Sequence, residues 1–216
     1  MWKAPATFTS GLRLLLLLVL FGAALACAKE DKTPQKPSAA ATNPYSNESV
    51  FDELIKKTAK DPADWEALYH LADLYERNAQ YAEAIETYRK VVKLDPKSGI
   101  NMGYVHFKIG TALDRTDHAA EAVDAFRKAL KYLPEYPVLY NNMGVAYGKL
   151  GRLDDEIAAL KKAVRLRASY SSARYNLGIA YLKKKDKKAA MTAYEALKGY
   201  DEGAAETLLK QIKAGS

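Results

Sequence analysis

The amino-acid sequence predicts an all-α fold that is built from repeated pairs of helices. Apolar residues recur at helical spacing, as in the i, i+3, i+4, i+7 series Leu68, Leu71, Ala72 and Tyr75. A second observation is a small residue that returns every 34 residues, at Gly110, Gly144 and Gly178. No stretch alternates apolar and polar residues in the way that predicts a β-strand. The 34-residue period therefore defines the unit from which the fold is built.

Other positions keep the same phase as the small residue, for which the first copy uses Ala72. Three residues later each copy has a large side chain, namely Tyr75, Leu113, Tyr147 or Tyr181. Twelve residues after the small residue come Ala84, Ala122, Glu156 or Ala190, and four residues further come Tyr88, Phe126, Leu160 or Tyr194. Pro96 and Pro134 follow in the first two copies, where proline ends a helix. Each unit thus contains two helices.

This spacing resembles the tetratricopeptide repeat, a 34-residue helix–turn–helix unit. The resemblance implies a right-handed α-solenoid of about four repeats, at residues 65–98, 103–136, 137–170 and 171–202. Within a domain of residues 48–216, a half-repeat helix at 48–60 would precede the array and a capping helix at 203–213 would follow it, since repeat arrays need caps. The resemblance also accounts for Gly144, whose position inside a helix costs about 1 kcal/mol. We expect this glycine to lie opposite the alanine position of the second helix.

Two departures from the repeat carry expectations of their own. The spacing from Ala72 to Gly110 is four residues too long, so residues 97–102 should form an extended loop or an additional helical turn. Glu156 occupies a position that is alanine in the other copies, and a buried carboxylate without a partner is costly. We expect Glu156 to reach solvent or a cation, or the helices to pack more loosely there.

The N-terminal residues predict export. Residues 1–26 combine Lys3 and Arg13 with an apolar run of 13 residues, as in a signal peptide, although a retained short membrane anchor is the alternative. The one cysteine, Cys27, follows directly, and the segment resembles a bacterial lipoprotein signal in which that cysteine is lipidated. Ala24 and Leu25 depart from that motif, and ordinary signal cleavage is the alternative. Residues 27–47 contain almost no aliphatic side chains and predict a disordered tether.

Charge is unevenly distributed over the predicted domain. Residues 48–136 hold 13 Lys and Arg against 16 Asp and Glu, a net charge of −3. Residues 137–216 hold 15 against 8, a net charge of +7. A charge asymmetry of this kind suits an acidic partner, an anionic surface or simply solubility. No nucleic-acid-binding motif accompanies it, so we expect no nucleic acid as a partner.

Catalysis is not predicted. His70, His106 and His118 do not have metal-ligand spacing, and the cysteine lies outside the repeats. The sequence contains no glycine-rich phosphate loop and no nucleophile elbow. We therefore expect no enzyme activity, no metal and no cofactor.

The resemblance implies that the first helix of each repeat lines a binding groove. Carried over by position, the groove residues are Tyr69, Asp73, Tyr104, Phe107, Thr111, Asn141, Asn142, Val145, Tyr175, Asn176 and Ile179. The aromatic rings would anchor an apolar or aromatic peptide, and the asparagines would bond its backbone. The alternative for each ring is packing between neighbouring repeats. Tyr69 and Asp73 exclude the carboxylate-binding clamp of related chaperone-binding modules, because they replace its Lys and Asn.

A basic run, Lys183, Lys184, Lys185, Lys187 and Lys188, is expected in the turn of the last repeat. It is either merely solvated or a site for anionic lipid or polymer. The combined prediction is an exported, lipid-anchored bacterial scaffold, on the periplasmic face of the outer membrane, that binds another protein. Assembly of a pilus or secretin machine and docking of cell-wall enzymes both fit. Binding of anionic polymer or lipid and self-assembly as a homo-oligomer are the alternatives.

Overall fold

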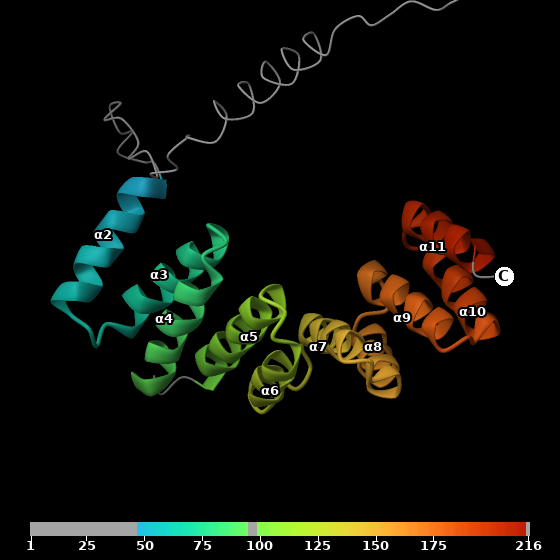
Figure 1. The fold of residues 1–216 in the computed structure, drawn as a ribbon, viewed down its shortest axis with the longest axis horizontal. Coiled ribbons are helices and arrows are strands. Elements are labelled where there is room, and N and C mark those ends of the chain that lie inside the picture. The colour runs from blue at the N-terminus through green and yellow to red at the C-terminus, as the bar shows by residue number, and fades with distance from the viewer. Residues whose placement is uncertain (1–46, 95–98, 215–216) are drawn as a thin grey trace, which may run out of the picture. The chain divides into compact units, whose positions relative to one another are not determined.

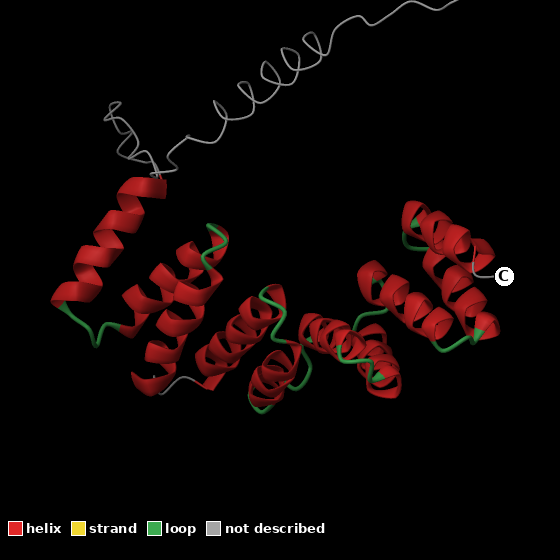
Figure 2. Cartoon of the chain, in the orientation of Figure 1, coloured by secondary structure: helices red, strands yellow, loops and turns green. Residues whose placement is uncertain are grey.

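The computed structural model describes residues 47–94 and 99–214, and the predicted signal peptide, Cys27 and most of the tether lie outside them. The chain divides into two units, 1–43 and 44–216, and the second contains every helix described below. In the described ranges the chain consists of helices joined by short turns and loops, without strands (Figures 1 and 2). The helices are α2 (Asn47–Lys60), α3 (Trp65–Arg77), α4 (Tyr81–Leu94), α5 (Gly99–Arg115), α6 (Ala119–Leu130), α7 (Pro137–Lys149), α8 (Leu153–Leu166), α9 (Ser171–Lys183), α10 (Lys187–Lys198) and α11 (Glu202–Ala214).

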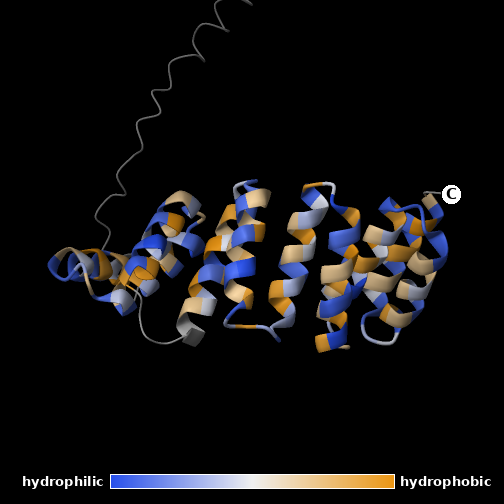
Figure 3. Ribbon diagram, turned by 90° about the horizontal axis from the view of Figure 1, so that it is seen from below, coloured by the Kyte–Doolittle hydropathy of each residue, from blue (hydrophilic) through white to orange (hydrophobic). Residues whose placement is uncertain are grey.

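The helices pack as consecutive pairs, which are α3 with α4, α5 with α6, α7 with α8, and α9 with α10. The prediction of four helix–turn–helix units is therefore confirmed. Each pair also packs on the next through the second helix of one and the first helix of the other. Each helix carries both hydrophobic and hydrophilic residues (Figure 3), which lets it bury one face and leave the other in water.

The turns inside the four units share a backbone feature. Seven residues after the small residue, the chain adopts a left-handed conformation, at Ala79 (φ 58°), Asp117 (φ 64°), Gly151 (φ 70°) and Lys185 (φ 62°). This conformation is costly for residues that carry a Cβ atom, and glycine occupies it in one unit alone. The same short turn thus reverses the chain four times in spite of different sequences.

The small residues lie at close helix contacts, and the atoms nearest to them belong to a large side chain rather than to the alanine position that the sequence predicts. A Cβ atom at Gly110 would lie 2.5 Å from Cε1 of Phe126, and one at Gly144 would lie 2.8 Å from Cγ of Leu160. Each of these two glycines therefore lies closest to the large side chain of the second helix, and Gly144 also lies near the carbonyl oxygen of Glu156, at the alanine position. At Gly178 the facing side chain is Leu208, which belongs to α11. At each of these glycines, a large side chain therefore occupies the space that a Cβ atom would need.

The flanking helices and the longer first spacing agree with the sequence. α2 packs on α3, where the ring of Phe51 meets Tyr75 edge-on at 5.0 Å. α11 packs on α9 and α10 and buries Leu208 and Ile212. α5 begins eleven residues before Gly110, whereas α7 begins seven residues before its glycine. The four extra residues thus extend the helix by one turn.

The core runs between the paired helices. Its largest fully buried side chains include Tyr88, Phe126, Leu139, Leu160 and Leu208. Among the described residues, no helix combines the length and the apolar character that crossing a membrane requires.

Candidate functional site

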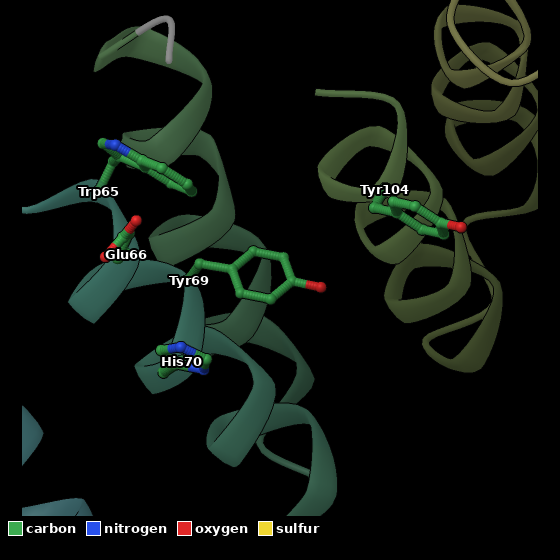
Figure 4. Close-up of a pocket in the computed structure, with 5 residues that line it drawn as sticks. All are labelled: Trp65, Glu66, Tyr69, His70 and Tyr104. Carbon is green, nitrogen blue, oxygen red and sulfur yellow. The ribbon is translucent and has the colours of Figure 1, made fainter. Parts of the chain in front are cut away.

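The first helices of the units, α3, α5, α7 and α9, share one face of the domain. α5 packs on α7 and α7 packs on α9, although each is separated from the next by a complete second helix in the sequence. The face contains two pockets. The pocket between α3 and α5, of about 340 Å³, is lined by Trp65, Glu66, Tyr69, His70 and Tyr104 (Figure 4). The pocket at α7, α8 and α9, of about 240 Å³, is lined by Val145, Gly148, Lys149, Glu156, Asn176, Ile179 and Lys183.

The predicted aromatic groove residues differ in how far packing uses them. Phe107 is half-buried, with ring centroids 6.1 Å from Phe126 and 5.4 Å from Tyr136. The ring of Tyr104 packs on the same Tyr136 ring, with centroids 5.7 Å apart, but Tyr104 remains 37% exposed. Phe107 thus mainly joins two repeats, whereas Tyr104 keeps a free ring surface.

The other two predicted rings are half-buried. The ring of Tyr69 packs against that of Tyr88, with centroids 5.8 Å apart, and burial raises the pKa of the Tyr69 phenol. Tyr69 nevertheless reaches from α3 toward α5 and lines the pocket there (Figure 4). Tyr175 packs against the C-terminal part of the core.

Polar groove residues are bonded between neighbouring helices. The ammonium of Lys108 on α5 lies 2.8 Å from Oδ1 of Asp73 and 2.9 Å from Oε2 of Glu76, both on α3. Burial alone would raise the pKa of Asp73, but Lys108 and Arg77 outweigh burial and lower it. Burial likewise opposes the charge of Lys108, yet the two carboxylates raise its pKa. Asp73 is therefore a charged inter-repeat contact rather than an open binding group.

The asparagines are engaged in a similar way. Asn176 Nδ2 on α9 donates to Asn141 Oδ1 on α7 at 3.0 Å, and Asn141 Nδ2 donates to Asn142 Oδ1 at 3.3 Å. Asn141 is buried and bonded to Asn176 and Asn142, so its amide is not available to a peptide. Thr111 also donates within its own helix, to the carbonyl oxygen of Phe107 at 3.0 Å.

One ion pair on this face is not predicted by the sequence. The ammonium of Lys149 on α7 lies 2.7 Å from Oδ1 of Asp114 on α5. Together with the Asp73–Lys108 and Asn141–Asn176 contacts, it links all four first helices in sequence. Each of these three contacts joins residues that are 35 positions apart. The interval of one repeat plus one residue is the signal that sequence reasoning could have used.

Glu156 has the cationic partner that was one of the expectations. Its side chain is 5% exposed, and the ammonium of Lys183 lies 2.9 Å from Oε1. Gly148 makes room for the carboxylate, because a Cβ atom there would lie 2.7 Å from Oε1. A buried charge is thus compensated by a lysine from the next unit.

The predicted basic patch is smaller than its sequence suggests. Lys183 is the last residue of α9 and pairs with Glu156, and Lys184 lies 2.6 Å from Oδ1 of Asp154. Lys187 and Lys188 begin α10, which leaves a turn of residues 184–186. Two of the five lysines therefore neutralise acidic residues of α8. Within the described ranges, no group of three or more His, Cys, Asp or Glu is placed to hold a metal ion.

Family models for the tetratricopeptide repeat match residues 66–98, 107–171 and 141–206, which together exceed half of the chain. The photosystem I assembly protein Ycf3 of Synechococcus sp. (strain CC9605) is 31% identical over 87 residues. That match covers 38% of this chain and 46% of Ycf3, so the chain spans less than half of this relative's length.

Solved structures share the fold at lower identity. A crystal structure of MamA has a TM-score of 0.68 and 24% identity, and covers 74% of this chain and 91% of MamA. YrrB, described as a tetratricopeptide repeat protein with an unusual peptide-binding site, has a TM-score of 0.67 and 17% identity. That match covers 76% of this chain and 84% of YrrB. The spacing, the paired helices and the matching family models agree, and the chain belongs to the tetratricopeptide repeat family.

Proposed function

We propose that this protein is a non-catalytic scaffold that binds a segment of another protein on the face formed by α3, α5, α7 and α9. The observation that carries the proposal is the exposed ring of Tyr104 beside the α3–α5 pocket. On the same face Asp73, Asn141 and Asn176 are already bonded to neighbouring helices. Large aromatic side chains of this kind are typical anchors for a partner. The resemblance to an assembly protein, Ycf3, supports a role in building a larger complex.

The partner segment would lie along the face rather than in one pocket. Val145, Asn176 and Ile179 line the α7–α9 pocket, and they continue the stripe that begins with Tyr69 and Tyr104. Side chains of an extended peptide could enter both pockets. The polar contacts between the first helices hold the two pockets at a defined separation, which favours one register of the bound segment.

Replacing Tyr104 with Ala and Ile179 with Ser in one variant tests this proposal. We expect the double variant to remain folded, because Tyr104 is exposed and Ile179 is only half-buried. Crosslinking followed by affinity purification from the native source should recover a partner with the wild type and lose at least about 90% of it with the double variant. Circular dichroism verifies the fold.

The matched control is Tyr132→Ala, which removes a tyrosine of similar exposure, 42%, that lines neither pocket of this face. The control should recover the partner as the wild type does. Equal recovery with the double variant would exclude this face as the binding site. Among the alternatives, binding of anionic lipid or polymer is less well supported, because Lys183 and Lys184 are already paired.

We also propose that the scaffold acts in a bacterial cell envelope, held on a membrane by lipid on Cys27, on the periplasmic face of the outer membrane. The support is the order of a basic start, a short apolar run, Cys27 and a polar tether in the sequence. Assembly of a pilus or secretin machine, or docking of cell-wall enzymes, would suit such a location.

Replacing Cys27 with Ala is expected to move the processed protein from the membrane fraction to the soluble fraction. The reason is that acyl chains contribute about 0.8 kcal/mol per buried CH₂ group to membrane binding. Fractionation with detection by immunoblot measures the shift, and Tyr132→Ala serves as the control. A processed Cys27→Ala protein that stays in the membrane fraction would exclude the lipid anchor.

A further inference from the structure

We propose that the pocket between α3 and α5 binds an arginine side chain, which a basic segment of the partner protein presents. This inference rests on the proposed function and specifies the chemistry of the partner. It starts from the lining of the pocket, where the rings of Trp65, Tyr69 and Tyr104 accompany one carboxylate, Glu66 (Figure 4).

The aromatic rings suit a cation. The face of an aromatic ring carries partial negative charge and attracts ammonium and guanidinium groups. Tryptophan attracts them more strongly than tyrosine or phenylalanine. Trp65 and Tyr69 come from α3 and Tyr104 comes from α5, so the rings that line the pocket belong to two helices. The volume of about 340 Å³ is sufficient for a guanidinium group.

The carboxylate discriminates between a cationic and an apolar occupant. Glu66 is exposed, so water solvates its charge. An apolar side chain in the pocket would remove some of that water without replacing its hydrogen bonds to the carboxylate, and this loss opposes the gain from contact with the rings. A guanidinium group would replace the water with a charge-assisted hydrogen bond and would also stack on an aromatic ring.

The charges around the pocket favour the same occupant. Lys108 is the cation that neighbours Tyr69, and it is bonded to both Asp73 and Glu76. Arg77 is bonded to Asp73 as well. Lys57 acts on Glu66, but it is itself paired with Asp64. Four carboxylates therefore face three cations, and these groups carry a net charge of −1: Glu66, Asp73, Glu76 and Asp64 against Lys57, Lys108 and Arg77. The surrounding residues 48–136 are also acidic, with a net charge of −3.

Fluorescence of Trp65 reports on the pocket directly. The chain has two tryptophans, Trp2 and Trp65, so a full-length Trp2→Phe protein contains Trp65 as its single tryptophan. The two probes are N-acetyl-arginine methylamide and its citrulline analogue, which has a similar shape without the charge. We expect the arginine probe to change the fluorescence saturably, with an affinity about tenfold higher than that of the citrulline probe.

Variants then assign the effect to the pocket. Glu66→Gln and Tyr104→Leu should each weaken binding of the arginine probe about fivefold, whereas Tyr104→Phe should retain it because the ring remains. Tyr132→Leu is the control and should bind as the parent does. Equal affinity for the two probes, absence of a response to the arginine probe, or insensitivity to Glu66→Gln would overturn the proposal.

The result separates this inference from the proposed function. If partner recovery depends on Tyr104 and Ile179 but the arginine probe does not bind, the face is a binding site and the cation pocket is excluded. If the arginine probe binds but recovery is unchanged, the proposed function fails instead. Light scattering addresses a second copy of the chain as the occupant, and self-association that Glu66→Gln abolishes would overturn the assignment to a different protein.

Discussion

Replacing Lys183 with Met is expected to lower the free energy of unfolding by about 2–3 kcal/mol. The ammonium of Lys183 lies 2.9 Å and 3.3 Å from the two carboxylate oxygens of Glu156, which is 5% exposed. Methionine keeps the apolar stem of the lysine but leaves a buried carboxylate without a cation. Lys183 itself is 44% exposed, so lost packing contributes little. Urea denaturation followed by circular dichroism measures the change.

A double-mutant cycle assigns that loss to the ion pair. In a Glu156→Ala background, which restores the residue type of the other repeats, Lys183→Met should change stability by less than about 0.5 kcal/mol. Lys184→Met is a matched control, because Lys184 pairs with Asp154, whose side chain is 85% exposed. Such exposed pairs contribute at most about 1 kcal/mol. An equal loss from Lys183→Met in both backgrounds would show that the carboxylate is not the cause.

The sequence predicts those parts of this protein that depend on local periodicity. A 34-residue phase is enough to place the paired helices, and four added residues before Gly110 are enough to lengthen α5 by one turn. The replacement of alanine by Glu156 also predicts its own compensation, because a buried carboxylate needs a cation. What periodicity does not provide is the identity of that cation, Lys183, which lies 27 residues away in the next unit.

The contacts that shape the site were harder to predict, because they form between units. Asp73, Asn141 and Asn176 occupy groove positions by phase, but each bonds to a neighbouring helix. Their availability to a ligand therefore depends on which residue lies 35 positions away in the sequence, since that residue can bond to them. Two lysines of the basic run, Lys183 and Lys184, likewise pair with Glu156 and Asp154, and this pairing follows from helix packing rather than from the run itself.

The turns illustrate a different limit. A left-handed backbone conformation is usually recognised by glycine, and Gly151 carries that signal. Ala79 and Lys185 adopt the same conformation without it. Packing of the paired helices outweighs the local preference of these residues, so the turn can be inferred from the repeat phase but not from its own composition.

Replacing Gly144 with Leu is expected to lower the free energy of unfolding by about 1–3 kcal/mol through overpacking. A Cβ atom there would lie 2.8 Å from Cγ of Leu160 and 3.4 Å from the carbonyl oxygen of Glu156. Leu160 is fully buried, so it has no open space into which it can move. The better helix propensity of leucine, about 1 kcal/mol, acts in the opposite direction and offsets part of the loss. Thermal denaturation and urea denaturation both measure the net effect.

Gly199 provides the matched control for this substitution, because it follows α10 with an ordinary φ of −75° and no atom lies within 4 Å of a Cβ atom built there. Gly199→Leu should therefore leave stability within about 0.5 kcal/mol of the wild type. An effect of Gly144→Leu as small as that of Gly199→Leu would contradict the close packing of α7 on α8 at Leu160. If the loss is confined to Gly144→Leu, the glycine inside the helix is required because a large side chain of the paired helix occupies the space of its missing Cβ atom.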